Sequence, residues 1–206
     1  MVEESGRLVE APKVGGRVSR CMVINGDLKS CEPIVIDGTV NGDIISDDSV
    51  AVQKGGIVRG KIEAKNILLE GFCEGPLEAE KVELTVGAQL IGYIVATQVR
   101  VAGSVDGDIL AREFLEVCKS GRIIAYECIS QRVIVKGTIR GEVTAKELLD
   151  MKTTATIEGD VAVKELRTEG AGKIFGAISR LESSLTEESA ASSSREEEFA
   201  QTLQYG

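Results

Sequence analysis

The chain has 206 residues, of which 43% are hydrophobic, yet only 3% are aromatic and none is Trp or His. Its net charge of −9 argues against nucleic acid as a partner, because binding a phosphate backbone requires a basic face. The sequence has no apolar run of 18 residues, no signal-peptide core near its start and no polybasic anchor for anionic lipid. A core built from Val, Ile, Leu and Gly favours a narrow, repetitive fold.

The first segment, residues 1–20, contains Pro12, Gly15 and Gly16 and shows no strong periodic pattern. We expect it to be a flexible N-terminal arm. Residues 21–180, which follow, are periodic throughout and are predicted to form one β-helix domain.

The repeat in this domain is an apolar residue, any residue, Gly, any residue and a second apolar residue. Its ten central positions are 26, 42, 60, 75, 92, 107, 125, 141, 159 and 176. Their mean spacing is (176−26)/9, or about 16.7 residues, and the copy around Ala125 is degenerate. Alternation with period two places both apolar residues on one face, and the Gly suits a sharp corner. We therefore predict an all-β solenoid of about ten stacked turns, on the order of 48 Å long.

Longer and shorter turns alternate along the predicted coil. The longer turns carry an extra polar corner near residues 53–55, 85–87, 119–121 and 152–154, which indicates a two-turn unit of about 33 residues. The β-branched alternation in residues 133–139 excludes a solenoid of helix pairs with that period.

The last segment, residues 181–206, differs from the repeat because it holds six Glu, one Arg and six Ser between 183 and 194. This composition predicts a disordered, acidic tail. A short docking helix is the alternative, because Ser194 has helix-capping chemistry and Phe199 and Leu203 are spaced to share one helix face.

The five cysteines are scattered and form no CxxC pair. In a chain without an export signal, we expect Cys21, Cys31, Cys73, Cys118 and Cys128 to be reduced thiols that fill the core.

Two stretches, VIDGTVNGDI at 35–44 and VKGTIRGEVTAK at 135–146, resemble the bactofilins, a family of bacterial β-helical cytoskeletal proteins. The resemblance covers roughly residues 22–180. It implies a single-stranded right-handed parallel β-helix of triangular section with flexible tails. It also implies nucleotide-independent filaments, and a scaffold for cell shape or for localising partner proteins.

Two features depart from the family pattern. Ten turns are more than the family usually has, so one rod and two offset segments meeting near residue 125 both remain open. The arm lacks the short apolar membrane-targeting stretch that many members carry. A cytoplasmic location is expected, with the inner face of the membrane reached through partners.

No active site is apparent. The lack of His removes the imidazole chemistry that enzymes of the left-handed hexapeptide solenoids use. Residues 54–56 lack the order of a phosphate-binding loop, and the Asp47–Asp48 pair suits a solvated corner. Asp106 and Asp108 flank Gly107 without other catalytic groups. We expect no enzyme activity, cofactor or metal.

The ends of a solenoid expose unpaired strand edges and apolar core, and neither end of this repeat has a strong capping element. We therefore predict a polymerisation interface formed by Ile24 and Leu28 at one end and Ile174, Phe175 and Ile178 at the other. Phe175 stands at a position that is polar in most other turns. The alternative is that the C-terminal tail folds back over Phe175.

A second candidate surface lies on the side of the rod, where apolar residues replace the polar ones that flank the central Gly elsewhere. Ile91, Tyr93, Ile124 and Tyr126 are predicted to form a lateral or partner-binding patch extending about 10 Å along the rod. A docked tail or a local register shift are the rival interpretations, because Glu127 breaks the apolar rule in that turn.

Two functions follow from this reading. The first is a self-assembling cytoskeletal scaffold whose partners are further copies of the chain and unidentified proteins. The second is a monomeric or oligomeric β-solenoid module that binds protein partners without forming filaments. An enzyme ranks far below both.

Overall fold

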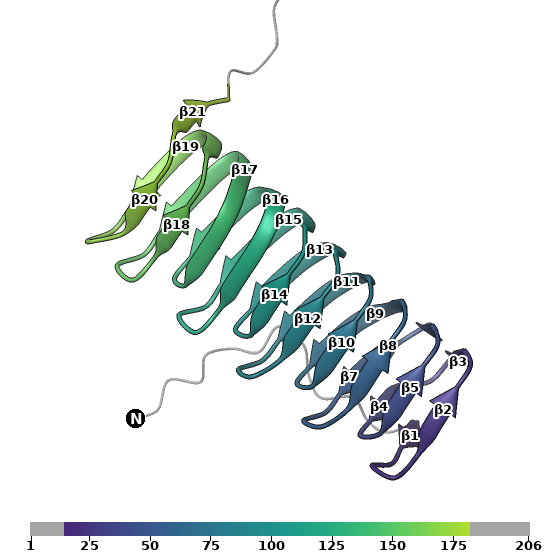
Figure 1. The fold of residues 1–206 in the computed structure, drawn as a ribbon. Helices are drawn as coiled ribbons and strands as arrows, with labels where there is room; N and C mark the ends of the chain where they lie inside the picture. Colours follow the sequence, from purple (N-terminus) through teal and green to yellow (C-terminus); the bar gives the residue numbers. More distant parts are fainter. Residues whose placement is uncertain (1–14, 182–206) are drawn as a thin grey trace, which may run out of the picture.

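The computed structural model describes residues 15–181, which form one straight rod of parallel strands (Figure 1). Its 21 strands belong to a single sheet in which each strand pairs with the equivalent strand one turn away. The predicted β-solenoid of about ten turns is confirmed.

Each turn contributes to three faces, which we call A, B and C in chain order. Short strands on face A are β1 (Gly16–Val18), β4 (Ile34–Ile36) and β7 (Ser49–Val52). Face B carries β2 (Val23–Asn25), β5 (Thr39–Asn41), β8 (Ile57–Arg59), β10 (Phe72–Glu74), β12 (Gln89–Ile91), β14 (Ser104–Asp106), β18 (Thr156–Glu158) and β20 (Lys173–Phe175). Face C carries β3 (Leu28–Ser30), β6 (Ile44–Ser46) and β21 (Ile178–Arg180).

The remaining strands are longer and bend around a corner. Five run from face C into face A, namely β9 (Ile62–Leu69), β11 (Leu77–Leu84), β13 (Ile94–Val101), β15 (Ile109–Val117) and β19 (Val161–Thr168). Two cover all three faces, namely β16 (Arg122–Val135) and β17 (Thr138–Met151).

The core is a single apolar column along the axis of the rod. On face B the central residue of each strand points inward, as Val40 does, and on face A the two flanking residues do, as Ile34 and Ile36 do. Because the same positions are buried in every turn, each turn covers the apolar stripe of its neighbour. This is the packing that the sequence repeat requires.

The corner between faces B and C explains the repeated glycine. Gly107, for example, has φ 141°, and a Cβ there would lie 2.2 Å from the carbonyl oxygen of Gly92 in the turn before. Both the left-handed backbone and the close approach of successive turns exclude a side chain. The corner glycines therefore stack directly on one another along the rod.

The degenerate copy at Ala125 departs from this geometry through a one-residue bulge. Ile124 pairs with Arg140 and Glu127 with Glu142, so that Ala125 and Tyr126 together lie opposite Gly141. The bulge places Cys128, in place of Glu127, at the inner position of face C. The register shift considered for this turn is confirmed.

An acidic side chain supports the bulge. Asp108 Oδ1 accepts hydrogen bonds from the backbone N–H groups of both Tyr126 (2.9 Å) and Glu127 (3.0 Å). The strand ladder continues on both sides, from β15 through β16 to β17, so the ten turns form one rod and not two offset segments.

The corner between faces A and B alternates in length, as predicted. Long corners occupy residues 19–22, 53–56, 85–88, 118–121 and 152–155, and short corners occupy 37–38, 70–71, 102–103 and 136–137. The alternation ends at the last corner, because residues 169–172 form a second consecutive long corner. The two-turn unit is therefore a real feature of the backbone.

All five cysteines are free. Cys73 and Cys128 are buried in the core, and burial raises the pKa of both thiols to about 12. The prediction that all five fill the core is wrong for Cys21 and Cys31, which are exposed. Both lie at corners of the coil, where the equivalent residues of later turns, Gly55 and Asp47, are exposed too. Cys118 also lies at a corner and is half-buried.

Candidate assembly surfaces

The N-terminal end of the rod is an open turn. Within residues 15–181, β1, β2 and β3 each pair on one side only, with β4, β5 and β6. Ile24 and Leu28 point into the core but are half-buried, whereas Val40 and Ile44 one turn further on are fully buried. This end therefore presents apolar core residues together with unpaired backbone edges.

The C-terminal end has the same character. In the described residues, β20 pairs only with β18, and β21 only with β19. Ile178 is 54% exposed, whereas Val161 directly below it is 1% exposed. Ile174 is half-buried above Ile157, which has no exposed surface.

Phe175 lies at the rim of this end. It is in register with Glu158, points outward and is 59% exposed. An exposed aromatic ring beside an open strand edge is suited to a contact with another copy. The five residues predicted for polymerisation thus form two surfaces at opposite ends of the rod, which can meet only between copies.

The four residues of the predicted lateral patch lie on one side of the rod. Ile91 and Ile124 share an outward column on face B, separated by Asp106. Tyr93 and Tyr126 occupy the adjacent corner, and all four side chains are exposed. Tyr126 protrudes most, because the bulge at Ala125 pushes it out of the coil.

Sequence reasoning missed the continuation of this patch onto face C. Val95, Leu110 and Ile129 occupy the outward position in three successive turns and line a hollow of about 260 Å³ together with Tyr93. The signal was available, since the outward position of face C is apolar in these three neighbouring turns. Asp108 and Glu127 add two carboxylates to the same hollow.

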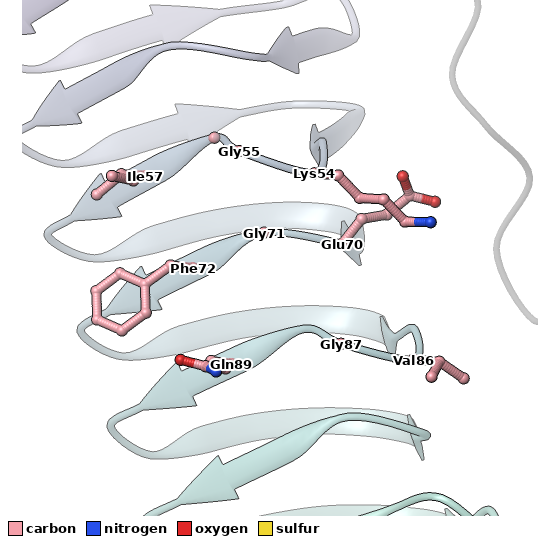
Figure 2. A pocket seen from close by; sticks show the side chains of 10 residues that line it. Lys54, Gly55, Ile57, Glu70, Gly71, Phe72, Val86, Gly87 and Gln89 are labelled. Carbon is pink, nitrogen blue, oxygen red and sulfur yellow. The ribbon is translucent and has the colours of Figure 1, made fainter.

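A further hollow of about 350 Å³ lies where a short corner sits between two long ones. Figure 2 shows Ile57, Phe72 and Gln89 at one end of it, and Lys54, Glu70 and Val86 at the other. A similar hollow of about 280 Å³ lies one two-turn unit along, between the corners at 85–88 and 118–121. Both are shallow consequences of the alternating corners.

Chemistry-bearing clusters were also sought along the coil. Between residues 15 and 181, no group of three or more Cys, Asp or Glu side chains is arranged to hold a metal ion. The same stretch contains no helix that is long and apolar enough to cross a membrane. The predicted docking residues Phe199 and Leu203 lie outside the described residues.

The fold of residues 15–181 defines a class of protein, the parallel β-helices in which each turn stacks on the next. Comparison with known families shows which family of parallel β-helices the chain resembles. The family model "Bactofilin: Polymer-forming cytoskeletal" matches the chain twice, over residues 17–100 and 94–179. The chain belongs to the bactofilin family.

Two curated relatives support this assignment. Bactofilin BacO from Myxococcus xanthus is 33% identical over 102 residues, which are 46% of this chain and 81% of BacO. Bactofilin BacP from the same organism is 31% identical over 91 residues, which are 44% of this chain and 37% of BacP. No solved structure gave a significant match.

Proposed function

We propose that the chain polymerises end to end into filaments, without a nucleotide, and acts as a cytoskeletal scaffold. The observation that carries this proposal is the pair of open terminal turns. Each exposes inner apolar side chains and a three-sided backbone edge in the geometry of the turn that would stack on it. Membership of a polymer-forming cytoskeletal family supports the same conclusion.

Stacking of one copy on another adds the contacts that every internal turn already has. Ile174 and Ile178 lose their exposure, and the free edges of β20 and β21 gain hydrogen-bond partners. Both gains recur at every joint, so assembly continues as long as free ends remain. Phe175 adds an aromatic contact at the rim.

The test is negative-stain microscopy and sedimentation of the purified chain, without nucleotide, over a range of concentrations and salt. We expect filaments about one rod wide. Phe175→Arg places a charge at the joint and is expected to raise the critical concentration at least tenfold. Glu74→Arg is the matched control, because it alters the same outward column outside the lateral patch and leaves both ends intact.

Discrete rods of the parent chain at every concentration would overturn the polymer proposal and favour the binding module. Equal critical concentrations for the parent and Phe175→Arg would instead remove Phe175 from the joint. The two results are distinguishable, because the first concerns the parent chain alone.

The apolar patch around Tyr93 and Tyr126 is proposed as the side on which filaments associate with one another or with partner proteins, in the cytoplasm. Its role would be the support of cell shape or the localisation of those partners. A Tyr93→Lys, Tyr126→Lys chain is expected to form single filaments that no longer bundle. Bundling equal to that of the parent would contradict a lateral contact here.

A further inference from the structure

Three apolar residues on the outside of the rod are buried although they point away from the core. Val35, Ala51 and Leu68 are central residues on face A in successive turns, paired in register. Their flanking neighbours point inward, so they point outward. Nevertheless they are 5%, 2% and 2% exposed, and they form an apolar cluster separate from the core. We call these three residues the face A strip.

The coil itself does not explain this burial. Leu110 occupies the equivalent outward central position on face C, between two apolar neighbours, and is 41% exposed. Every strand of residues 15–181 belongs to the rod, so no described element lies over face A. The cover must therefore come from outside that range.

The point at which the chain enters the coil identifies the segment. Gly15 and Gly16 both donate a backbone hydrogen bond to Pro33 O, at 3.1 and 2.9 Å, and Pro33 directly precedes β4. A Cβ at Gly15 would lie 2.5 Å from the Cβ of Glu32, so the chain runs close against the second turn here. The described chain therefore begins in the turn next to Val35, the first residue of the strip.

Distance favours residues 1–14 over residues 182–206 as the cover of the face A strip. The strip ends at Leu68, three turns or about 14 Å from β1, and 14 extended residues reach about 46 Å. Residues 182–206 follow Leu181, which pairs with Val163 at the opposite end of the rod.

We propose that residues 1–14 lie along face A and cover the face A strip with their apolar side chains. These are Val2, Leu8, Val9, Ala11, Pro12 and Val14.

This docking does not depend on filament formation. It converts the expected flexible arm into a cover for an apolar surface that three turns of the coil would otherwise expose. A chain whose arm is displaced would present that surface to a partner.

Limited trypsin digestion of the full chain tests the proposal, because Arg7 and Lys13 are cleavage sites within the arm. Cleavage at both is expected to be at least tenfold faster in Ala51→Glu, Leu68→Glu than in the parent. The matched control is Ile45→Glu, Ala162→Glu, which places two charges on outward positions of face C outside the lateral patch. This control is expected to cleave at the parent rate.

A second variant changes only the arm and so cannot disturb the coil. In an Ala51→Cys reporter, mass spectrometry follows alkylation of residue 51 specifically. Adding Leu8→Asp, Val9→Asp is expected to accelerate that alkylation at least tenfold. Equal alkylation rates, or hydrogen exchange of residues 1–14 in the parent at the rate of a free peptide, would overturn the proposal. Protection that disappears on dilution would assign the cover to a neighbouring copy, and would also overturn it.

Discussion

The two halves of the rod, each matched by one copy of the family model, are alike inside and different outside. Inner positions on all three faces are apolar from Ile34 to Val163, except for Ser46 and Ser130 on face C, and one core runs through both halves. The outward column of face A differs. In the first half it is the apolar strip of Val35, Ala51 and Leu68, and in the second half it is mostly charged.

Several charged side chains of the second half form ion pairs within the coil. Glu116 is paired with Lys136 at 2.6 Å and with Arg100 at 3.6 Å, and Asp150 is paired with Lys152 at 3.1 Å. The face A strip of the first half cannot be stabilised by ion pairs, because its apolar side chains are stabilised by removal from water. The comparison teaches that inner residues specify the coil, whereas outer residues decide what lies on each part of it.

The largest effect is expected at the corner glycines between faces B and C, which both halves share. Gly107→Ala combines a left-handed φ with a clash against the backbone of Gly92, and should cost about 3 kcal/mol or more. Ala125→Gly, at the bulged corner, should cost only about 0.5–1 kcal/mol, because no left-handed conformation is needed there. Urea unfolding measures both, and similar losses would mean that the two corners do not differ as described.

The next effect should be the same in both halves, because it concerns the core. Folding raises the pKa of Cys73 and of Cys128 to about 12, so above pH 9 the unfolded chain releases protons that the folded chain retains. Their contribution is complete below pH 9 and is lost as the pH rises toward 12. From pH 8 to 10 the free energy of unfolding should fall by about 1.4 kcal/mol per thiol.

Cys73→Val and Cys128→Val serve as controls for that pH dependence. Each should flatten the pH profile by the same amount, since each removes one buried thiol from one half. Unequal changes would show that the two halves do not unfold together.

The smallest effect concerns the charged outer column of the second half. Glu116→Gln should cost about 1 kcal/mol, because the carboxylate is largely buried between Arg100 and Lys136. Glu158→Gln, whose partner Arg140 is exposed, should change stability by less than about 0.5 kcal/mol. Urea titrations at low and high salt distinguish the two variants. Equal losses of stability would show that the charged outward column of face A has no structural role.

Much of the fold was predictable, because each turn repeats the same local demands. The spacing of glycines from Gly26 to Gly176 fixed the number of turns, and the polar corners fixed the alternation of long and short turns. The bulge at Ala125 was foreseen only as an alternative, since Glu127 signalled a conflict without indicating which residue would replace it. Only the backbone register shows that Cys128 takes the inner position in place of Glu127.

The surfaces were less predictable, because outward positions are not constrained by the repeat. The face A strip left a trace in the sequence, where Ile34-Val35-Ile36 and Ile67-Leu68-Leu69 are wholly apolar in place of the usual alternation. That trace shows that the outward residue is unusual but not that it is covered. Cys21 and Cys31 were misassigned for a related reason, since both occupy corners, where residues are exposed in later turns as well.

The unbroken ladder along the rod has a mechanical consequence. The two family units meet at residues 94–100. They are joined there by covalent chain and continuous backbone pairing, where separate single-unit subunits would meet at a non-covalent seam. An end-to-end polymer of this chain contains half as many seams per unit length as one built from single units. Because a filament breaks at its seams, fragmentation should be rarer and the severed pieces correspondingly longer.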